Sequence, residues 1–399
     1  MSECDAVPSV TVQELRERAA RFQVHLAAEG LAGAVLVQNV DRYYFSGTMQ
    51  AGYVVVPVEG DPLVLVRRDP DRAGRESPLP VQALGSLRDL AGRIRASLGE
   101  LPSPVGVEED VLPATQRNRL EALLAGVELR DASRAIQRTR AVKSPWEVER
   151  IREAARAVAE AVETVPRYLF PGVSELELSA RVECELRLRG HGGLVRMRGF
   201  NQELFFGHVM AGAAAAQPSF LDAPTGGLGA APALAQGASR RPIRPGDPVV
   251  VDLVGNSAGY LSDQTRIFSL GEPREPFGRA FEAALAVERA VVEAARPGVP
   301  ASRLYEAALE AAAASPFAGH FMGEVQRVSF VGHGIGLEVD ELPFLARGFD
   351  APLEEGMVFA VEPKFVFAGR GVVGIEDTFR VGADGAERLT PSPQVLTVV

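Results

Sequence analysis

The chain has 399 residues, of which 46% are hydrophobic and 24% are charged, and its 52 acidic and 42 basic residues give a net charge of −10. This length and composition support a large buried core and two domains, and they exclude a disordered or fibrous protein. The negative charge also disfavours nucleic acid and anionic membranes as partners.

The beginning of the chain carries no targeting signal. Its first ten residues, MSECDAVPSV, lack a basic region followed by an apolar run. No stretch approaches the roughly 18 apolar residues that cross a bilayer. Cys4 and Cys184 make neither a disulfide framework nor a thiolate metal site. We therefore expect a cytoplasmic protein without membrane contact, in which oxygen and nitrogen hold any metal.

The first part of the chain predicts an α/β domain without candidate chemistry. Apolar residues at helical spacing follow a candidate N-cap, Thr11, and stop at Gly30. Two apolar runs separated by the turn sequence EGDP are typical of a hairpin. The expected elements are a helix at 11–29, strands at 31–39, 53–58 and 63–68, a strand at 105–109, a helix at 115–126 and a strand at 127–132.

The charged segment 133–147, which contains Ser144-Pro145, is the best candidate for a linker. It places an N-terminal domain at residues 1–137 and a C-terminal domain at 138–399. The second domain opens with an amphipathic helix at 146–169, which Pro166 is expected to interrupt near its end. Later expected features are a capping box at Ser174 and Glu177, a helix to Gly190 and a long irregular loop at 211–237.

The second domain repeats itself. PGVSELELSARVE resembles PGVPASRLYEAALE, GDPVVVD resembles EGMVFAVE, and DQTRIF resembles EDTFRV. Each half predicts a helix, a strand that ends in a carboxylate, a turn, and a strand with a carboxylate followed two residues later by Thr. A duplicated α/β unit with a pseudo-twofold axis explains this pattern.

The repeat places four acids, Asp252, Asp263, Glu362 and Glu376, in largely buried strands. A buried carboxylate needs a cation or a proton, and no matching buried Arg or Lys is visible for all four. Each acid taken alone is equally compatible with a solvated or Arg-paired residue. The symmetric set favours two divalent metal ions, Mn, Co, Zn or Fe, with His333 as a nitrogen ligand. The GHGIG run around His333 is a weak phosphate-loop signal, because no helix follows it.

The phrases VVVDLVGNSAGYLSDQTR, VGHGIGLEVDE, AVEPKF and GIEDTF resemble those of the pita-bread metallopeptidases, the family of methionine aminopeptidase, aminopeptidase P, prolidase and creatinase. The first domain resembles that of the aminopeptidase P, prolidase and creatinase branch. The resemblance implies a pita-bread catalytic domain, a homodimer and a bridging hydroxide that attacks a carbonyl carbon. It also implies that the ligands of two metals are Asp252, Asp263, His333, Glu362 and Glu376.

The sequence departs from this family at several positions. Asp340 and Gln236 stand where the branch has two further His residues, and Gly374 stands where an Arg usually helps to hold the substrate. The family's EPGxY becomes EPKFV, so that Lys364 replaces Gly and Val366 replaces Tyr. Proton transfer and stabilisation of the reaction intermediate are therefore expected to differ from those of the family.

Three residues are candidates to replace the missing groups. Lys364, one of two lysines in the chain, shares a strand face with Glu362 and is expected to contact an anionic substrate; the alternative is a surface or ion-paired residue. His208 supplies an imidazole or has a structural role. Asp340 acts as a general base or pairs with an Arg.

We predict a dinuclear metallohydrolase that resembles Xaa-Pro dipeptidases and aminopeptidases and cleaves a short peptide or a related amide. The alternative is a non-peptidase on the same scaffold, either an amide hydrolase of a small metabolite or a lyase. A protein that only binds partners is disfavoured, because it would have no reason to keep all five ligands.

Overall fold

The computed structural model describes residues 10–399, which divide into two compact units. Within the described residues, the first unit comprises 10–140 and Arg198–Asn201, and the second comprises Ala141–Met197 and Gln202–Val399. The sequence did not predict that the segment Arg198–Asn201 belongs with the first unit. Cys4 lies outside the described residues.

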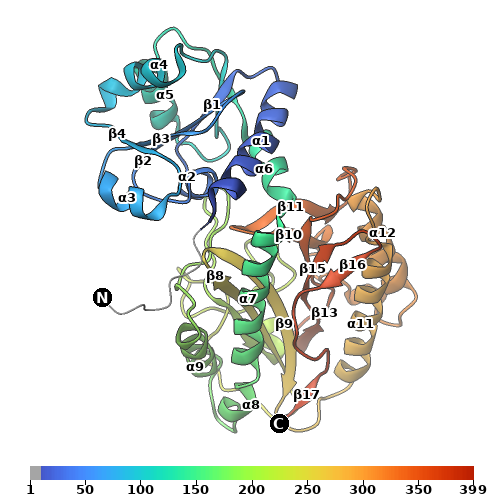
Figure 1. Cartoon of the computed structure of the whole chain (residues 1–399). Coiled ribbons are helices and arrows are strands. Elements are labelled where there is room, and N and C mark those ends of the chain that lie inside the picture. Colours follow the sequence, from blue (N-terminus) through green and yellow to red (C-terminus); the bar gives the residue numbers. More distant parts are fainter. Residues whose placement is uncertain (1–9) are drawn as a thin grey trace. The chain divides into compact units, whose positions relative to one another are not determined.

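The first unit is built on one mixed sheet of six strands in the order β4-β3-β2-β1-β5-β6 (Figure 1). The predicted first helix is confirmed, and the Thr11 hydroxyl accepts a hydrogen bond from the Glu14 N–H at 3.1 Å. The predicted hairpin is also confirmed, as the antiparallel pair β2 and β3. The elements are α1 (Val12–Ala28), β1 (Gly33–Leu36), α2 (Asn39–Ser46), β2 (Gly52–Pro57), β3 (Leu63–Val66), α3 (Pro70–Glu76), β4 (Val81–Ala83), α4 (Leu90–Leu98), β5 (Val105–Val107), α5 (Ala114–Leu123), β6 (Leu129–Asp131) and α6 (Ser133–Ala141).

The predicted linker at 133–147 is wrong for most of its length, because α6 occupies its first nine residues. Ala135, Ile136 and Arg140 are buried at helical spacing, so one side of this charged segment packs inside the protein. The Arg140 guanidinium lies 2.8 Å from the Asp41 carboxylate in a buried ion pair. The charge of Arg140 therefore reflects ion pairing, whereas Arg134 and Arg138 of the same helix are exposed.

The helices of the second unit begin with α7 (Pro145–Val162), α8 (Val165–Tyr168) and α9 (Glu175–Leu188). The expected interruption of the helix at 146–169 is confirmed, because α7 and α8 separate just before Pro166. The Ser174 capping box is confirmed, and Cys184 is exposed on α9. The predicted irregular loop contains a short helix, α10 (Gly212–Ala215), in which Ala214 and Ala215 are buried. The remaining helices are α11 (Phe277–Ala294) and α12 (Ala301–Ala313).

The strands of the second unit form sheets with the orders β17-β9-β8-β7, β11-β10-β12-β15-β16 and β13-β14. The antiparallel triplet β7-β8-β9 is repeated as β10-β12-β15, which matches the predicted duplication. The strands are β7 (Gly207–Ala211), β8 (Pro248–Ser257), β9 (Tyr260–Ser269), β10 (Phe330–Ile335), β11 (Val339–Ala346), β12 (Val358–Val361), β13 (Lys364–Phe367), β14 (Gly371–Gly374), β15 (Asp377–Val381), β16 (Ala386–Arg388) and β17 (Thr397–Val398).

Strand alternation separates the apolar core from the acids. Val249 and Val251 of β8 pack in one apolar cluster with residues of α7 and α9. Phe359 and Val361 of β12 pack in another apolar cluster with residues of α11 and α12. Because successive side chains point to opposite faces, the acids at even positions of both segments lie on the faces away from these helices.

One expectation about the strands is wrong. Asp252 lies in the middle of β8, which continues to Ser257, whereas the repeat predicted that each first strand ends in its acid. Glu362 does follow the last residue of β12, where Pro363 has no N–H to continue the strand ladder. Within residues 10–399, no helix combines the length and apolar character needed to cross a membrane.

Candidate metal centre

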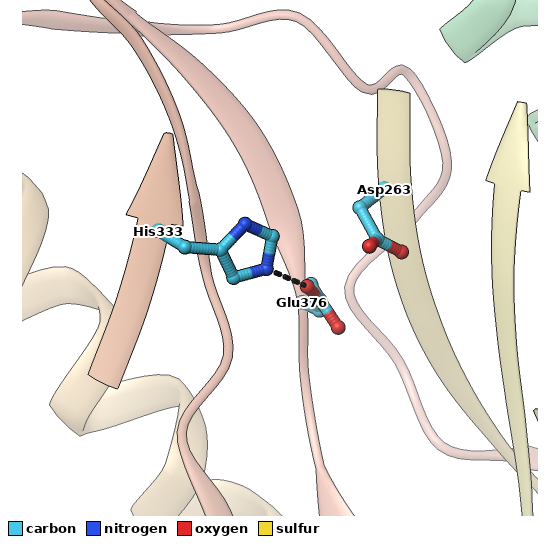
Figure 2. Close-up of side chains that lie close together, drawn as sticks. All are labelled: Asp263, His333 and Glu376. Carbon is cyan, nitrogen blue, oxygen red and sulfur yellow. Dashed lines mark ion pairs between the residues drawn. The ribbon is translucent and has the colours of Figure 1, made fainter. Parts of the chain in front are cut away.

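The fold brings together the five residues that the sequence predicted as ligands, and all five are buried. Asp263, His333 and Glu376 each offer one ligand atom, and these three atoms lie within 4.8 Å of one another (Figure 2). Asp263 lies in β9, His333 lies in β10, and Glu376 immediately precedes β15. The two halves of the duplicated domain therefore contribute to one cluster.

The duplicated Thr residues join the two halves at this cluster. The Thr265 hydroxyl, two residues after Asp263, donates to Glu376 Oε2 at 2.9 Å. The Thr378 hydroxyl, two residues after Glu376, accepts the Asp263 N–H at 3.0 Å. Each Thr thus contacts the acidic residue of the other half. The sequence showed this pattern, but its role depends on long-range pairing.

His333 is oriented by its neighbours. Its Nδ1 lies 3.2 Å from the Gly334 carbonyl oxygen and 3.6 Å from Asp340 Oδ1. Its Nε2 lies 3.8 Å from Glu376 Oε1 and 3.9 Å from Glu362 Oε1. A carbonyl or carboxylate at one ring nitrogen fixes the tautomer and leaves the other nitrogen for a metal. Asp340 therefore lies beside His333, whereas one of its two predicted roles was pairing with an Arg.

Lys364 lies inside the cluster, with only 2% of its side chain exposed. Its Nζ donates to Glu362 Oε2 at 2.7 Å, to Asp252 Oδ2 at 3.1 Å and to Glu376 Oε2 at 3.2 Å. The expected direction of this side chain, toward the ligands, agrees with these contacts. The expectation of a surface position is wrong, whereas the ion-paired alternative is confirmed. The sequence showed no buried Arg or Lys that matches all four acids, and this lysine pairs with three of them.

Two departures from the family pattern are neighbours in space. Lys364 of β13 and Gly374 of β14 are directly paired residues of one hairpin. A Cβ atom at position 374 would lie 2.6 Å from Lys364 Cγ and 2.6 Å from the Pro363 carbonyl oxygen. Any residue other than glycine would collide with the lysine stem or the backbone. The glycine at 374 therefore makes room for the lysine at 364.

Burial and mutual repulsion shift the pKa values of the cluster residues. Burial raises the pKa of Glu376 to about 8, and Glu362 and Asp252 add to that increase against the lowering effect of Lys364. Burial and the neighbouring carboxylates also raise the pKa of Asp263 well above its usual range. Burial lowers the pKa of His333, but Asp340 and the cluster carboxylates more than offset this and raise it. These groups favour an added cation or proton.

His208 lies beside the cluster, paired in register with Asp252 across β7 and β8. Its Nε2 lies 2.9 Å from Gln236 Nε2, so the ring nitrogen accepts from the amide. Burial lowers the pKa of His208, which favours the neutral ring, although Asp252 acts in the opposite direction. Gln236 Oε1 has no hydrogen-bond partner among the described residues. The sequence did not predict that these two candidates touch.

Lys143, the second lysine, is also buried in an ion pair of the same unit. Its Nζ lies 3.0 Å from Glu341 Oε2, and Glu341 Oε1 accepts the N–H groups of Leu337 and Glu338. This carboxylate therefore fastens the turn between β10 and β11, next to Asp340. Sequence reasoning missed Glu341.

The donor set fits a divalent metal. Asp263, His333 and Glu376 supply one nitrogen and two carboxylates from buried positions. Such mixed nitrogen and oxygen sites suit Mn, Fe, Co or Zn better than Mg or Ca. The raised pKa values of Asp263 and Glu376 agree, because a metal would replace the protons that these groups retain.

Comparisons with known proteins cover both units. Residues 149–383 match the model of metallopeptidase family M24, and residues 18–142 match the Creatinase/Prolidase N-terminal domain. The probable dipeptidase PepE of Mycobacterium tuberculosis is 32% identical over 94% of this chain and 93% of its own length. The Xaa-Pro dipeptidase of Pyrococcus furiosus is 27% identical over 96% of this chain and 100% of its own.

Solved structures show the same architecture. The dipeptidase PepE from Mycobacterium ulcerans superposes with a TM-score of 0.78 at 29% identity, and the match covers 98% of this chain and 100% of that chain. The prolidase from Pyrococcus horikoshii gives a TM-score of 0.78 at 26% identity over 94% and 99% of the two chains. The predicted two-domain α/β fold with a pita-bread catalytic domain is confirmed.

Proposed function

The chain belongs to metallopeptidase family M24 and carries a Creatinase/Prolidase N-terminal domain, and from this premise we propose that it hydrolyses Xaa-Pro dipeptides in a metal-dependent reaction. The observation that carries the proposal is the buried cluster of Asp263, His333 and Glu376. This cluster lies in a chain that aligns over nearly its whole length with named dipeptidases. The substrate class follows from these relatives.

Asp252, Asp263, His333, Glu362 and Glu376 are the proposed metal ligands. The sequence favours two divalent ions, and Mn, Co, Zn and Fe all suit this donor set. When bound, a divalent ion supplies Lewis-acid polarisation of a peptide carbonyl and lowers the pKa of a coordinated water.

The proposed roles of the other residues follow from their positions. Asp340, 3.6 Å from His333 Nδ1, holds the imidazole in orientation, and its 41% exposed side chain also allows it to accept a proton from a substrate or water. His208 presents a buried neutral ring beside Asp252. Lys364 supplies a fixed positive charge to the carboxylates.

A non-peptidase reaction is the second candidate. Gln236, which stands where the branch has a His, contacts His208 through its amide nitrogen and offers no titratable group. Gly374 likewise offers no side chain to hold a substrate carboxylate. These two replacements favour a small-metabolite amide hydrolase or a lyase if dipeptides are not cleaved.

A substrate panel tests the proposal. Mn-loaded and Co-loaded protein is incubated with Leu-Pro, Ala-Pro, Leu-Leu and Leu-Pro-Gly, and the products are separated by chromatography. We expect release of proline from the two Xaa-Pro dipeptides and little cleavage of the other two peptides. Preferential cleavage of Leu-Pro-Gly would indicate an aminopeptidase. No cleavage of any peptide by metal-loaded protein would favour the non-peptidase alternative.

We propose a homodimer that works in the cytoplasm, as the family resemblance implies. Light scattering after size-exclusion chromatography tests the first point, since a monomer and a dimer differ twofold in mass. Cell fractionation tests the second point.

A further inference from the structure

Lys364 uses its whole hydrogen-bonding capacity inside the cluster. An ammonium group has three N–H donors, and Nζ of Lys364 has three carboxylate partners at 2.7, 3.1 and 3.2 Å. They belong to Glu362, Asp252 and Glu376, which come from both halves of the duplicated domain. This contact set makes the ammonium a central cation of the cluster.

Glu376 divides the cluster into two cation positions. Its Oε1 faces His333 Nε2 at 3.8 Å, and its Oε2 faces Lys364 Nζ at 3.2 Å. The first position lies among Asp263, His333 and Glu376, whose ligand atoms are mutually close. The second position is that of the ammonium, among the oxygens of Asp252, Glu362 and Glu376.

An ammonium and a divalent ion cannot share the second position. Transition metals bind carboxylate oxygens at about 2.0–2.2 Å, so an ion held by these three oxygens would stand against Nζ. Two like charges at contact distance in a buried site repel strongly. Lys364 also has little freedom to leave, because its side chain is 2% exposed and its Cγ lies over Gly374.

We propose that the Lys364 ammonium fills one of the two cation positions, so that each chain binds a single divalent ion, held by Asp263, His333 and Glu376. The inference rests on the proposed metal dependence and changes its stoichiometry from two ions to one. Lys364 is then a built-in substitute for a metal ion, and Gly374 is the residue that admits it.

Metal counting on the full chain tests this proposal directly. The chelator-treated protein is dialysed against excess Mn²⁺, and bound Mn is measured by elemental analysis together with electron paramagnetic resonance. We expect one Mn²⁺ per wild-type chain and the spectrum of an isolated ion. Two bound ions, or the spectrum of a spin-coupled pair, would overturn the proposal while leaving metal dependence intact. No bound ion would overturn both.

Substitution of Lys364 identifies the occupant of the second position. Lys364→Ala removes the ammonium and most of the stem, and we expect the count to rise to two Mn²⁺ per chain with a spin-coupled spectrum. Lys143→Met is the matched control, because it removes the other buried lysine of the same unit and should leave the count at one. A count that stays at one in folded Lys364→Ala protein would refute the assignment. If that variant does not fold, the wild-type count alone still decides the stoichiometry.

Discussion

Lys143 provides a test of how much a buried ion pair contributes to the free energy of unfolding of the second unit. Its Nζ lies 3.0 Å from Glu341 Oε2, and the two side chains are 1% and 7% exposed. Lys143→Met keeps most of the side-chain volume but removes the charge from this buried pair. Glu341 also accepts the N–H groups of Leu337 and Glu338, so the turn that precedes Asp340 depends on the same carboxylate.

The expected cost follows from the depth of the pair. Removing one partner of a buried ion pair costs about 3–5 kcal/mol, because the remaining charge stays in a poorly solvating environment. For a unit of this size, that loss lowers the melting temperature by roughly 5–20 °C. Replacing both partners, as Lys143→Met with Glu341→Gln, should cost less than the sum of the single substitutions, because no buried charge is left over.

Urea denaturation of wild type, both single variants and the double variant at pH 7 completes a double-mutant cycle. We expect a favourable coupling energy between Lys143 and Glu341 of about 1–3 kcal/mol. A free energy of unfolding of Lys143→Met within about 0.5 kcal/mol of wild type would show that the buried pair contributes little to stability. Additive single-variant effects would show that the two side chains do not act as a pair.

Three further predictions concern the site, its specificity and the pH response of the first unit. Asp263→Ala or His333→Ala should abolish activity and reduce bound metal, because each removes a ligand from a shared cluster. With Gly374 in place of the usual Arg, turnover of Leu-Pro should be on the order of 10²-fold slower than in ordinary prolidases, measured as proline release. Burial, reinforced by Asp41, raises the pKa of Glu108 from 4.5 to about 7, so the folded chain retains a proton that the unfolded chain releases between these pH values. The free energy of unfolding should therefore fall as pH rises through this window, by roughly 3 kcal/mol at pH 8. Glu108→Gln should remove this fall. Urea titrations of both proteins at pH 5 and pH 8 measure it.

Each of these predictions has a contrary result. Full metal content in purified Asp263→Ala protein would end the ligand assignment. Turnover of Leu-Pro at ordinary prolidase rates would show that other residues perform the role of the missing Arg. A stability difference between Glu108→Gln and wild type that is the same at pH 5 and pH 8 would place the ionised carboxylate of Glu108 in a well-solvated or well-paired environment.

Local patterns in the sequence predicted most of the elements. The capping box of Ser174 and the burial of β8 and β12 depend on neighbours within a few residues, and both are seen in the structure. The segment containing Arg140 was misread because its charge suggested solvent, whereas the guanidinium forms a buried ion pair with Asp41, 99 residues earlier in the chain. Composition alone does not distinguish solvated from paired charge.

The candidate ligands were predictable, but their partners were not. The repeated motifs marked Asp263 and Glu376 because the duplication is visible in the sequence itself. The contacts of Lys364 join residues that are 2, 12 and 112 positions apart, so they follow from the register of several strands. The fit between Lys364 and Gly374 likewise exists only once β13 and β14 are paired.

Metal-dependent cleavage of Xaa-Pro dipeptides is tested by the release of proline from Leu-Pro by chelator-treated protein, before and after addition of Mn²⁺. Asp263→Ala protein serves as the control in the same assay. We expect negligible release of proline without metal, measurable release after Mn²⁺ is added to wild-type protein, and none from the variant. Equal release with and without metal, or an unimpaired Asp263→Ala protein, would contradict it.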